Sequence, residues 1–230
     1  ALYNETVQLF TMDPDIKTVS DLKGKDVSIG ASGSGVYFNA LDVLEGAGLG
    51  INDINPQYQS FEDSKEALKD GRIDAAFIVA GAPTSAITEL ATTNGVYLVN
   101  INGEVRDRIM EECSYYEPLT IPAGTYPGQD EDVETITVKA VLIVSADADE
   151  DTVYKLTAAL FDHADEITQE NAKGSELSVE NATSVQTLPF HKGAARYYAE
   201  HGITVNTDES SAKTEPENTF SEASDSSENN

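Results

Sequence analysis

The feature that most constrains the fold is an alternation of apolar runs and amphipathic stretches between about residues 26 and 112. Each run is long enough for a strand, and each following stretch has apolar residues at helical spacing before a glycine. The run DAAFIVA at 74–80 is the form expected of a strand covered on both faces. This order predicts an α/β fold with a mostly parallel sheet. The expected strands are 7–12, 27–30, 55–59, 74–80, 96–101 and 135–145, and the expected helices are 36–45, 60–70, 85–91, 104–112, 149–167 and a segment within 189–201, with Ser20 capping a short turn at 21–23.

The charge balance excludes two classes of partner. The chain has 41 acidic and 14 basic residues, for a formal net charge of −27. Binding to nucleic acid or to anionic lipid requires clustered lysine and arginine, so neither is expected. No run approaches the length of a membrane helix, and the longest apolar run, Val138 to Val144, is interpreted as a buried strand. The single cysteine, Cys113, excludes an intramolecular disulfide and a cysteine metal cluster.

A glycine- and serine-rich loop connects an expected strand to an expected helix. Ser32, Gly33, Ser34 and Gly35 lie where backbone amides and the helix dipole together favour an anion. The loop is not a Walker A motif, because no Gly-Lys-Ser/Thr ends it, and it lacks the third glycine of a dinucleotide fingerprint. It therefore indicates either a small-anion site or a tight turn without a ligand.

A second small-residue loop follows the strand at 74–80. It consists of Gly81, Ala82, Pro83 and Thr84 and precedes another expected helix. Ligands of open α/β sheets bind outside the carboxyl ends of the strands, so the two loops are expected to share one wall of a site. The alternative is that Gly81 and Pro83 serve only to cap and start the helix.

No catalytic constellation emerges from the sequence. His163, His191 and His201 accompany no nucleophile motif. Asp147, Asp149 and Asp151 have the spacing of calcium ligands, but the glycine and the distal glutamate of such a loop are missing. No catalytic residue, metal ligand or cofactor is predicted, and the protein is not expected to be an enzyme.

The alternation of expected strands and helices is interrupted at 114–134. This segment is rich in proline and glycine and indicates an ordered connection between lobes. Beyond residue 206 the chain is almost entirely Ser, Glu, Asp, Asn and Thr. Such a segment buries too little apolar surface to offset the entropy of ordering it. A disordered acidic tail is therefore expected at 206–230.

Several segments together resemble a known family. SDLKGKDVSIGASGSG at 20–35 is similar to the lobe entry of type II periplasmic solute-binding proteins. FEDSKEALKDGRIDAAFIVAGAPTSAI, IPAGTYPGQDEDVETITVKAVLIV and LPFHKGAARYYAEHG resemble the TAXI branch of TRAP-transporter receptors. The resemblance implies two α/β lobes that close on a small carboxylate such as glutamate or 2-oxoglutarate. It further implies a monomeric extracytoplasmic receptor, periplasmic or anchored as a lipoprotein, that delivers the ligand to TRAP membrane subunits.

The resemblance also assigns ligand-binding residues and lobes. The family's anion loop corresponds to Ser32, Gly33, Ser34, Gly35 and Val36, where Val36 replaces a frequent threonine; the other matching positions are Asn39, Gly81, Ala82, Pro83, Thr84 and Tyr126. Nothing before Val7 matches the first lobe's own glycine-rich loop, so an N-terminal part is expected to be missing. The implied organisation is a hinge strand and remnant of lobe 1 at 1–24, a complete lobe 2 at 25–119, and a hinge crossing with the C-terminal part of lobe 1 at 120–205.

Three other functions fit the same fold. An ABC-transporter receptor would differ in its permease and ligand. An enzyme, such as a deaminase-like or prephenate-dehydratase-like protein, would require a nucleophile or an acid–base pair in the cleft. A sensory module would carry a fused signalling domain, of which the acidic tail gives no sign.

Overall fold

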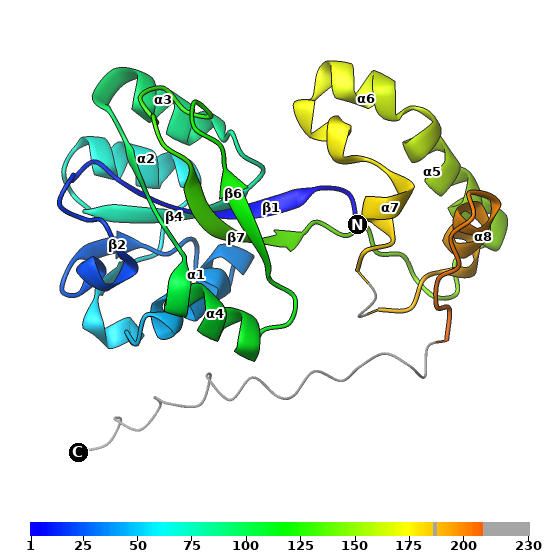
Figure 1. Ribbon diagram of the computed structural model, residues 1–230, viewed down its shortest axis with the longest axis horizontal. Helices are drawn as coiled ribbons and strands as arrows, with labels where there is room; N and C mark the ends of the chain where they lie inside the picture. Colours follow the sequence, from blue (N-terminus) through cyan, green and yellow to red (C-terminus); the bar gives the residue numbers. More distant parts are fainter. Residues whose placement is uncertain (186–187, 209–230) are drawn as a thin grey trace. The chain divides into compact units, whose positions relative to one another are not determined.

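The computed structural model describes residues 1–185 and 188–208, which form parts of two compact units (Figure 1). The sheet unit comprises Tyr3–Val141, and the helical unit comprises Ala1–Leu2 and the chain from Leu142 onward. The tail expected at 206–230 lies outside the described residues from 209 onward.

The sheet unit is a seven-stranded sheet with helices on both faces. Its strands are β1 Asn4–Thr11, β2 Asp26–Ser28, β3 Asn55–Gln57, β4 Ala75–Ala80, β5 Tyr97–Val99, β6 Glu117–Ile121 and β7 Val133–Lys139. Its helices are α1 Gly35–Gly46, α2 Phe61–Lys69, α3 Ser85–Asn94 and α4 Gly103–Glu112, with short 3₁₀ turns at Val19–Leu22 and Ile51–Asp53.

The strand order is β3-β2-β4-β1-β7-β6, and β5 also pairs with β1. Only β2 with β3 and β2 with β4 are parallel; the pairs that involve β1 and the pair β6–β7 are antiparallel. The α/β class is thus correct, but the expectation of a mostly parallel sheet is wrong. The parallel pairs are joined through helices α1 and α2, whereas β6 and β7 are consecutive strands without a helix between them.

Strand β1 lies at the centre of the sheet, and its role as a hinge strand stays a prediction. One of its edges pairs along Thr6–Thr11 with β4. Its other edge pairs at Asn4–Thr6 with β7 and at Leu9–Thr11 with β5. The sheet unit, Tyr3–Val141, is therefore wider at both ends than the lobe expected at 25–119.

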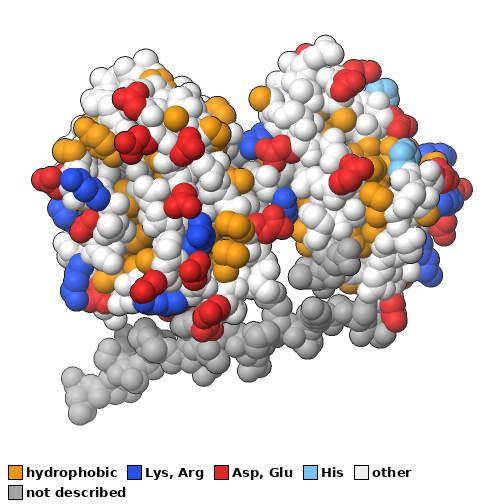
Figure 2. Space-filling view, viewed as in Figure 1, with side chains coloured by type: hydrophobic (Ala, Val, Ile, Leu, Met, Phe, Trp, Pro, Cys, Tyr) orange, Lys and Arg blue, Asp and Glu red, His pale blue; other side chains and the backbone are white. Residues whose placement is uncertain are grey.

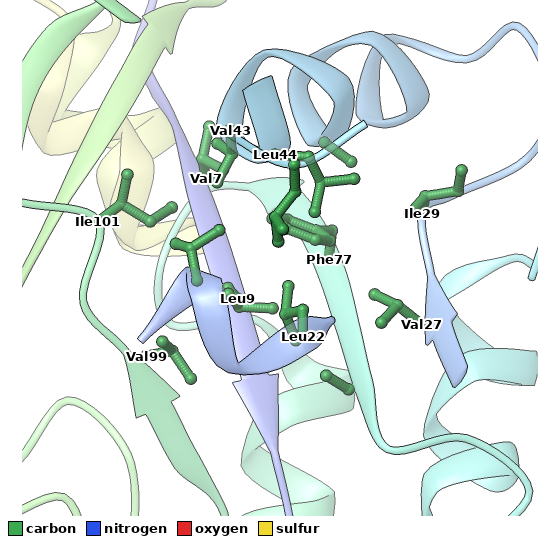
Figure 3. Packing of buried hydrophobic residues seen from close by; sticks show 14 of the residues in the cluster. Val7, Leu9, Leu22, Val27, Ile29, Val43, Leu44, Phe77, Val99 and Ile101 are labelled. Carbon is green, nitrogen blue, oxygen red and sulfur yellow. The ribbon is translucent and has the colours of Figure 1, made fainter. Parts of the chain in front are cut away.

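Each face of the sheet has its own core. On one face, Leu9 and Phe77 pack with residues of α1 and α4, and on the other Phe10 and Ile78 pack with residues of α2 and α3. Figure 3 shows Phe77 close to Leu44 of α1 within the first cluster. Alternation along β1 and β4 supplies both cores, because successive strand residues point to opposite faces.

Two predicted ends in this unit are corrected. Thr18 and not Ser20 caps the turn Val19–Leu22, since the Thr18 hydroxyl and amide both donate to the Asp21 carboxylate. Strand β7 ends at Lys139 and not at 145. The apolar residues after it are exposed, Leu142 by 66% and Ile143 by 74%, because no strand of the described chain pairs with them. The interpretation of Val138 to Val144 as a buried strand is therefore wrong: residues 138–140 are half-buried and 141–144 are exposed.

The helical unit contains α5 Glu150–Asp162, α6 Ala164–Glu170, α7 Val179–Ala182 and α8 Lys192–Glu200, with a 3₁₀ turn at Ala172–Glu176. The helix expected at 149–167 is interrupted at His163, whose backbone leaves helical geometry. Tyr197 and Tyr198 of α8 form a small core with Ala182, and no strand lies among the described residues of this unit. No helix in the described chain is long and apolar enough for a membrane crossing.

Candidate ligand-binding site

Three loops lie at one edge of the sheet. Strand β2 runs parallel to its neighbours β3 and β4, so the carboxyl ends of all three meet at the same edge. The loops that leave this edge are 29–35 before α1, 58–60 before α2 and 81–84 before α3. Carboxyl edges of this kind are where open α/β folds bind ligands, so the three loops define the candidate site.

The loop 29–35 presents free backbone donors at the start of α1. Ser34 is the N-cap, and its hydroxyl accepts a hydrogen bond from the Tyr37 amide at 3.2 Å. Within the described chain, the amides of Gly33, Gly35 and Val36 donate to no protein atom. Exposed amides at the positive end of a helix of twelve residues attract an anion.

Aromatic side chains border this loop, and the sequence did not point to them. Tyr37 lies 5.2 Å from Phe38 and 6.0 Å from Tyr58, measured between ring centroids. Phe38 and Tyr58 are each about half exposed, so both rings offer accessible apolar surface beside the loop. Tyr58 directly follows β3 in the structure, whereas the strand expected at 55–59 includes it, so no signal in the sequence indicated its position at the site.

The loop 81–84 rests on a buried polar network. The Tyr126 hydroxyl accepts from the Thr84 amide at 2.9 Å and donates to Gln8 Oε1. Gln8 Nε2 donates to Thr84 Oγ1 at 2.9 Å and to the Ala80 carbonyl at 3.2 Å. Burial raises the pKa of Tyr126, so this hydroxyl stays protonated and keeps its donor at neutral pH.

Asn39 also lies in the interior. Its Nδ2 donates to the Tyr116 hydroxyl at 2.6 Å, and that hydroxyl donates to Asp42 Oδ2 at 2.7 Å. Tyr115 donates to the same oxygen at 3.2 Å. The network ties α1 to the segment after α4, so Asn39 anchors the helix whose first turn carries the free amides.

The structure separates the predicted site residues into two groups. Asn39 and Tyr126 are buried and hydrogen-bonded to other protein groups, and they support the elements that carry the other predicted residues. The remaining predicted residues lie on two of the three loops and in the first turn of α1 at the same edge; they are Ser32, Gly33, Ser34, Gly35, Val36, Gly81, Ala82, Pro83 and Thr84. Their contact with a ligand stays a prediction.

The charge of the protein does not concentrate on these loops. Residues 29–35, 58–60 and 81–84 contain no acidic or basic side chain. Figure 2 shows acidic side chains spread over the visible surface and not gathered in one patch. No group of three metal-ligating side chains occurs in the part of the chain that the structure describes. The three loops therefore present amides, hydroxyls and aromatic rings.

The buried Asp42 carboxyl gives a first prediction. Burial raises the pKa of Asp42, although hydrogen bonds from Tyr116 and Tyr115 act in the opposite direction. A carboxyl with a raised folded-state pKa contributes stability that is present below its unfolded value, near 4, and is lost as the pH rises through the folded value. We expect Asp42→Asn to gain stability relative to the wild type between pH 4 and pH 7, as measured by urea unfolding.

Asp21→Asn is the matched control with the opposite sign. Hydrogen bonds from Thr18 lower the pKa of Asp21, so its ionised form stabilises the fold above the unfolded pKa. This variant should lose stability relative to the wild type as the pH rises towards the unfolded pKa, near 4, and the difference should stay nearly constant from there to pH 7. If both variants shifted in the same direction, burial of Asp42 would not explain the result.

Sequence comparison identifies relatives of the chain. A protein of Escherichia coli (strain K12) that is named as an aliphatic sulfonates-binding protein is 39% identical over 69 residues, which are 30% of this chain and 21% of that protein. The alkanesulfonate-binding protein SsuA of Xanthomonas axonopodis pv. citri, solved with MOPS bound, is 22% identical, with a TM-score of 0.43 over 86% of this chain and 57% of the other. The periplasmic aliphatic sulphonate binding protein SsuA of Escherichia coli is 20% identical, with a TM-score of 0.44 over 85% and 51%.

At these scores, no residue's role carries over from the solved structures, and the chain spans only part of the length of each relative. The predicted α/β class is confirmed by the central sheet and its helices, whereas most of the strand pairs are antiparallel. One family description, NMT1-like, matches residues 1–202, which include all the strands and helices described above. The chain belongs to the NMT1-like family.

Proposed function

We propose that this chain is the solute-binding part of an extracytoplasmic receptor that captures a small organic anion and passes it to an ABC-type membrane transporter. The observation that carries the proposal is the set of free amides on Gly33, Gly35 and Val36 at the start of α1. Binding and not catalysis is proposed, because the three loops offer donors but no nucleophile or acid–base pair.

The loops suggest which part of the site binds the anionic group of the ligand and which part binds its organic portion. The anionic group lies on the amides of 33–36, where the helix dipole favours it without a basic side chain. The organic part lies against the rings of Tyr37, Phe38 and Tyr58, which offer exposed apolar surface next to those amides. A small sulfonate or carboxylate with an apolar body fits both features.

The ABC transporter is favoured over the TRAP transporter as the partner. The relatives above are named for binding sulfonates, and the family match is to the NMT1-like family, so the TAXI resemblance rests only on its motifs. Delivery of glutamate or 2-oxoglutarate to TRAP subunits is the second candidate, supported by the segment IPAGTYPGQDEDVETITVKAVLIV. A preference for sulfonate or for dicarboxylate distinguishes the two.

The test is an NMR titration of the ¹⁵N-labelled chain. Ethanesulfonate, glutamate and 2-oxoglutarate are added separately to about 10 mM, which detects dissociation constants in the millimolar range, near 4 kcal/mol of binding energy. The amides of Gly33, Gly35 and Val36 should shift first. If none of them shifted with any of the three anions, the proposal would be wrong.

Gly35→Val sharpens the test. Gly35 has no atom within 4 Å of an added Cβ and no positive φ, so the fold tolerates a side chain there. A branched side chain at the first position of α1 covers the adjacent amides, and we expect binding to weaken at least about tenfold. Gly50→Ala changes a glycine outside the three loops, where an added Cβ would make only an ordinary contact with Asp53 Oδ2 at 3.7 Å; it is the control and should leave the titration unchanged. Unchanged affinity in Gly35→Val would mean that 29–35 is only a turn.

A further inference from the structure

Gln8 is a polar side chain in an otherwise apolar stretch of the central strand. It is 1% exposed, and its neighbours Val7, Leu9 and Phe10 all belong to the cores. A buried amide costs free energy unless its donors and acceptor are satisfied. An apolar residue would avoid that cost, so the hydrogen bonds of Gln8 are what distinguish this position.

The bonds of Gln8 all lead to one loop. Its Nε2 donates to the carbonyl of Ala80, the last residue of β4, and to the hydroxyl of Thr84, the N-cap of α3. Its Oε1 accepts from the Tyr126 hydroxyl, which in turn accepts from the Thr84 amide. Gln8 therefore holds the residue before the loop 81–84 directly, and it holds the last residue of the loop both directly and through Tyr126.

The network extends into the loop and joins three distant segments. Thr84 Oγ1 donates to the Gly81 carbonyl at 3.2 Å, so the hydroxyl that Gln8 holds also fixes the first residue of the loop. Strand β1, the end of β4 and the connection between β6 and β7 meet at Gln8. With both ends tied, the loop 81–84 has a defined path at the carboxyl edge of the sheet.

We infer that Gln8 is a positioning residue, which holds the loop 81–84 in the conformation that receives the ligand. The inference rests on the proposed function for its second part, the effect on the ligand. Its first part, the fixing of the loop, concerns the free protein. Gln8 does not touch the ligand; it acts through Thr84 and Tyr126.

Gln8→Met tests the first part. Methionine has nearly the same length and no hydrogen-bonding amide, so the core stays filled while the network is lost. Amide hydrogen exchange in the free protein should accelerate about tenfold at Thr84, because the Tyr126 hydroxyl that accepts from this amide is no longer held by Gln8. Exchange should change little in the middle of β4. Unchanged exchange at Thr84 would overturn the inference.

Thr11→Val is the matched control. Thr11 is also buried in β1 and also bonded to β4, through its hydroxyl and the Asp74 carbonyl at 2.6 Å, but at the opposite end of the strand. It removes a hydrogen bond from the same strand pair without touching the loop. Thr84 exchange should therefore be unaffected in Thr11→Val, and an equal acceleration in both variants would show general loosening of the sheet and contradict positioning by Gln8.

A double variant separates positioning from simple destabilisation. Tyr126→Phe removes the hydroxyl that links Gln8 to the Thr84 amide. If the two residues act as one unit, Gln8→Met with Tyr126→Phe accelerates Thr84 exchange little more than Tyr126→Phe alone. Fully additive effects would mean that the two residues do not act together, and would overturn the relay.

The ligand arm uses ethanesulfonate and 2-oxoglutarate as probes in the NMR titration. Binding to Gln8→Met should be about tenfold weaker than to the wild type, and binding to Thr11→Val unchanged. If neither probe nor glutamate shifted the loop amides of the wild type, the proposed function would fail, while the exchange result would still decide whether Gln8 holds the loop. Normal affinity in Gln8→Met would refute its role in binding.

Discussion

Gly30→Ala is expected to lower the free energy of unfolding by about 2–4 kcal/mol, more than an alanine substitution at any other glycine of this loop. Gly30 has φ +81°, a conformation that costs other residues energy. An added Cβ would also lie 2.7 Å from Cβ of Val36 and 3.0 Å from Oγ of Ser34. Urea unfolding followed through backbone NMR signals of the sheet unit measures the loss.

Two glycines of the same loop are controls that separate strain from crowding. Gly33 has φ +71° but open space around its Cβ position, so Gly33→Ala should cost only about 1–2 kcal/mol. Gly35 has neither a positive φ nor a close neighbour, so Gly35→Ala should change stability by no more than about 0.5 kcal/mol. Equal costs at Gly30 and Gly33 would show that contact with Val36 is relieved by small movements.

Phe77→Ala should be the most destabilising single truncation in the sheet unit, by about 3–5 kcal/mol. The ring is 1% exposed at the centre of the cluster in Figure 3, and β4 is held by β1 and β2 on both edges. Because β4 is held on both edges, the residues around the ring cannot move far into the space that it leaves. The cost therefore includes the free energy of the remaining cavity in addition to the lost free energy of burying the ring. The same urea experiment measures the effect.

Phe38→Ala removes the same ring from an exposed position and is the control. Phe38 is 52% exposed on α1 and contacts Tyr37 edge-on, so its removal should cost about 1 kcal/mol or less. It should nevertheless weaken anion binding if the organic part of the ligand lies on the rings. A cost at Phe38 close to that at Phe77 would contradict the burial pattern.

Local signals predicted the helices and the first elements of the sheet unit well. α1, α2 and α3 lie within a few residues of their expected positions, because glycine stops and caps act within one turn. β6 was missed because Pro118 indicates a loop, yet β6 is the edge strand, where a missing amide is tolerated. Pro56 occupies the opposite edge strand, β3, so both edges of the sheet carry a residue that discourages pairing with another chain.

Pairing between distant segments could not be predicted in the same way. No local pattern states that β1 runs antiparallel to β4, because the register between residues 6–11 and 75–80 depends on which edges remain free. The same applies to the candidate site. The glycine loops were visible in the sequence, but the contact between Gln8 and Tyr126, 118 residues apart, depends on tertiary packing.

The central place of β1 has a consequence for how the chain reaches its fold. Strand β1 precedes all of its partners β4, β5 and β7 in the sequence, and the last of them ends only at Lys139. Until β7 is available, the part of β1 that pairs with it lacks its native partner, and closing such long loops is slow. Folding of the sheet unit is therefore delayed until most of its length is available, and this waiting period is when the nascent chain depends most on chaperones and on its own negative charge to avoid aggregation.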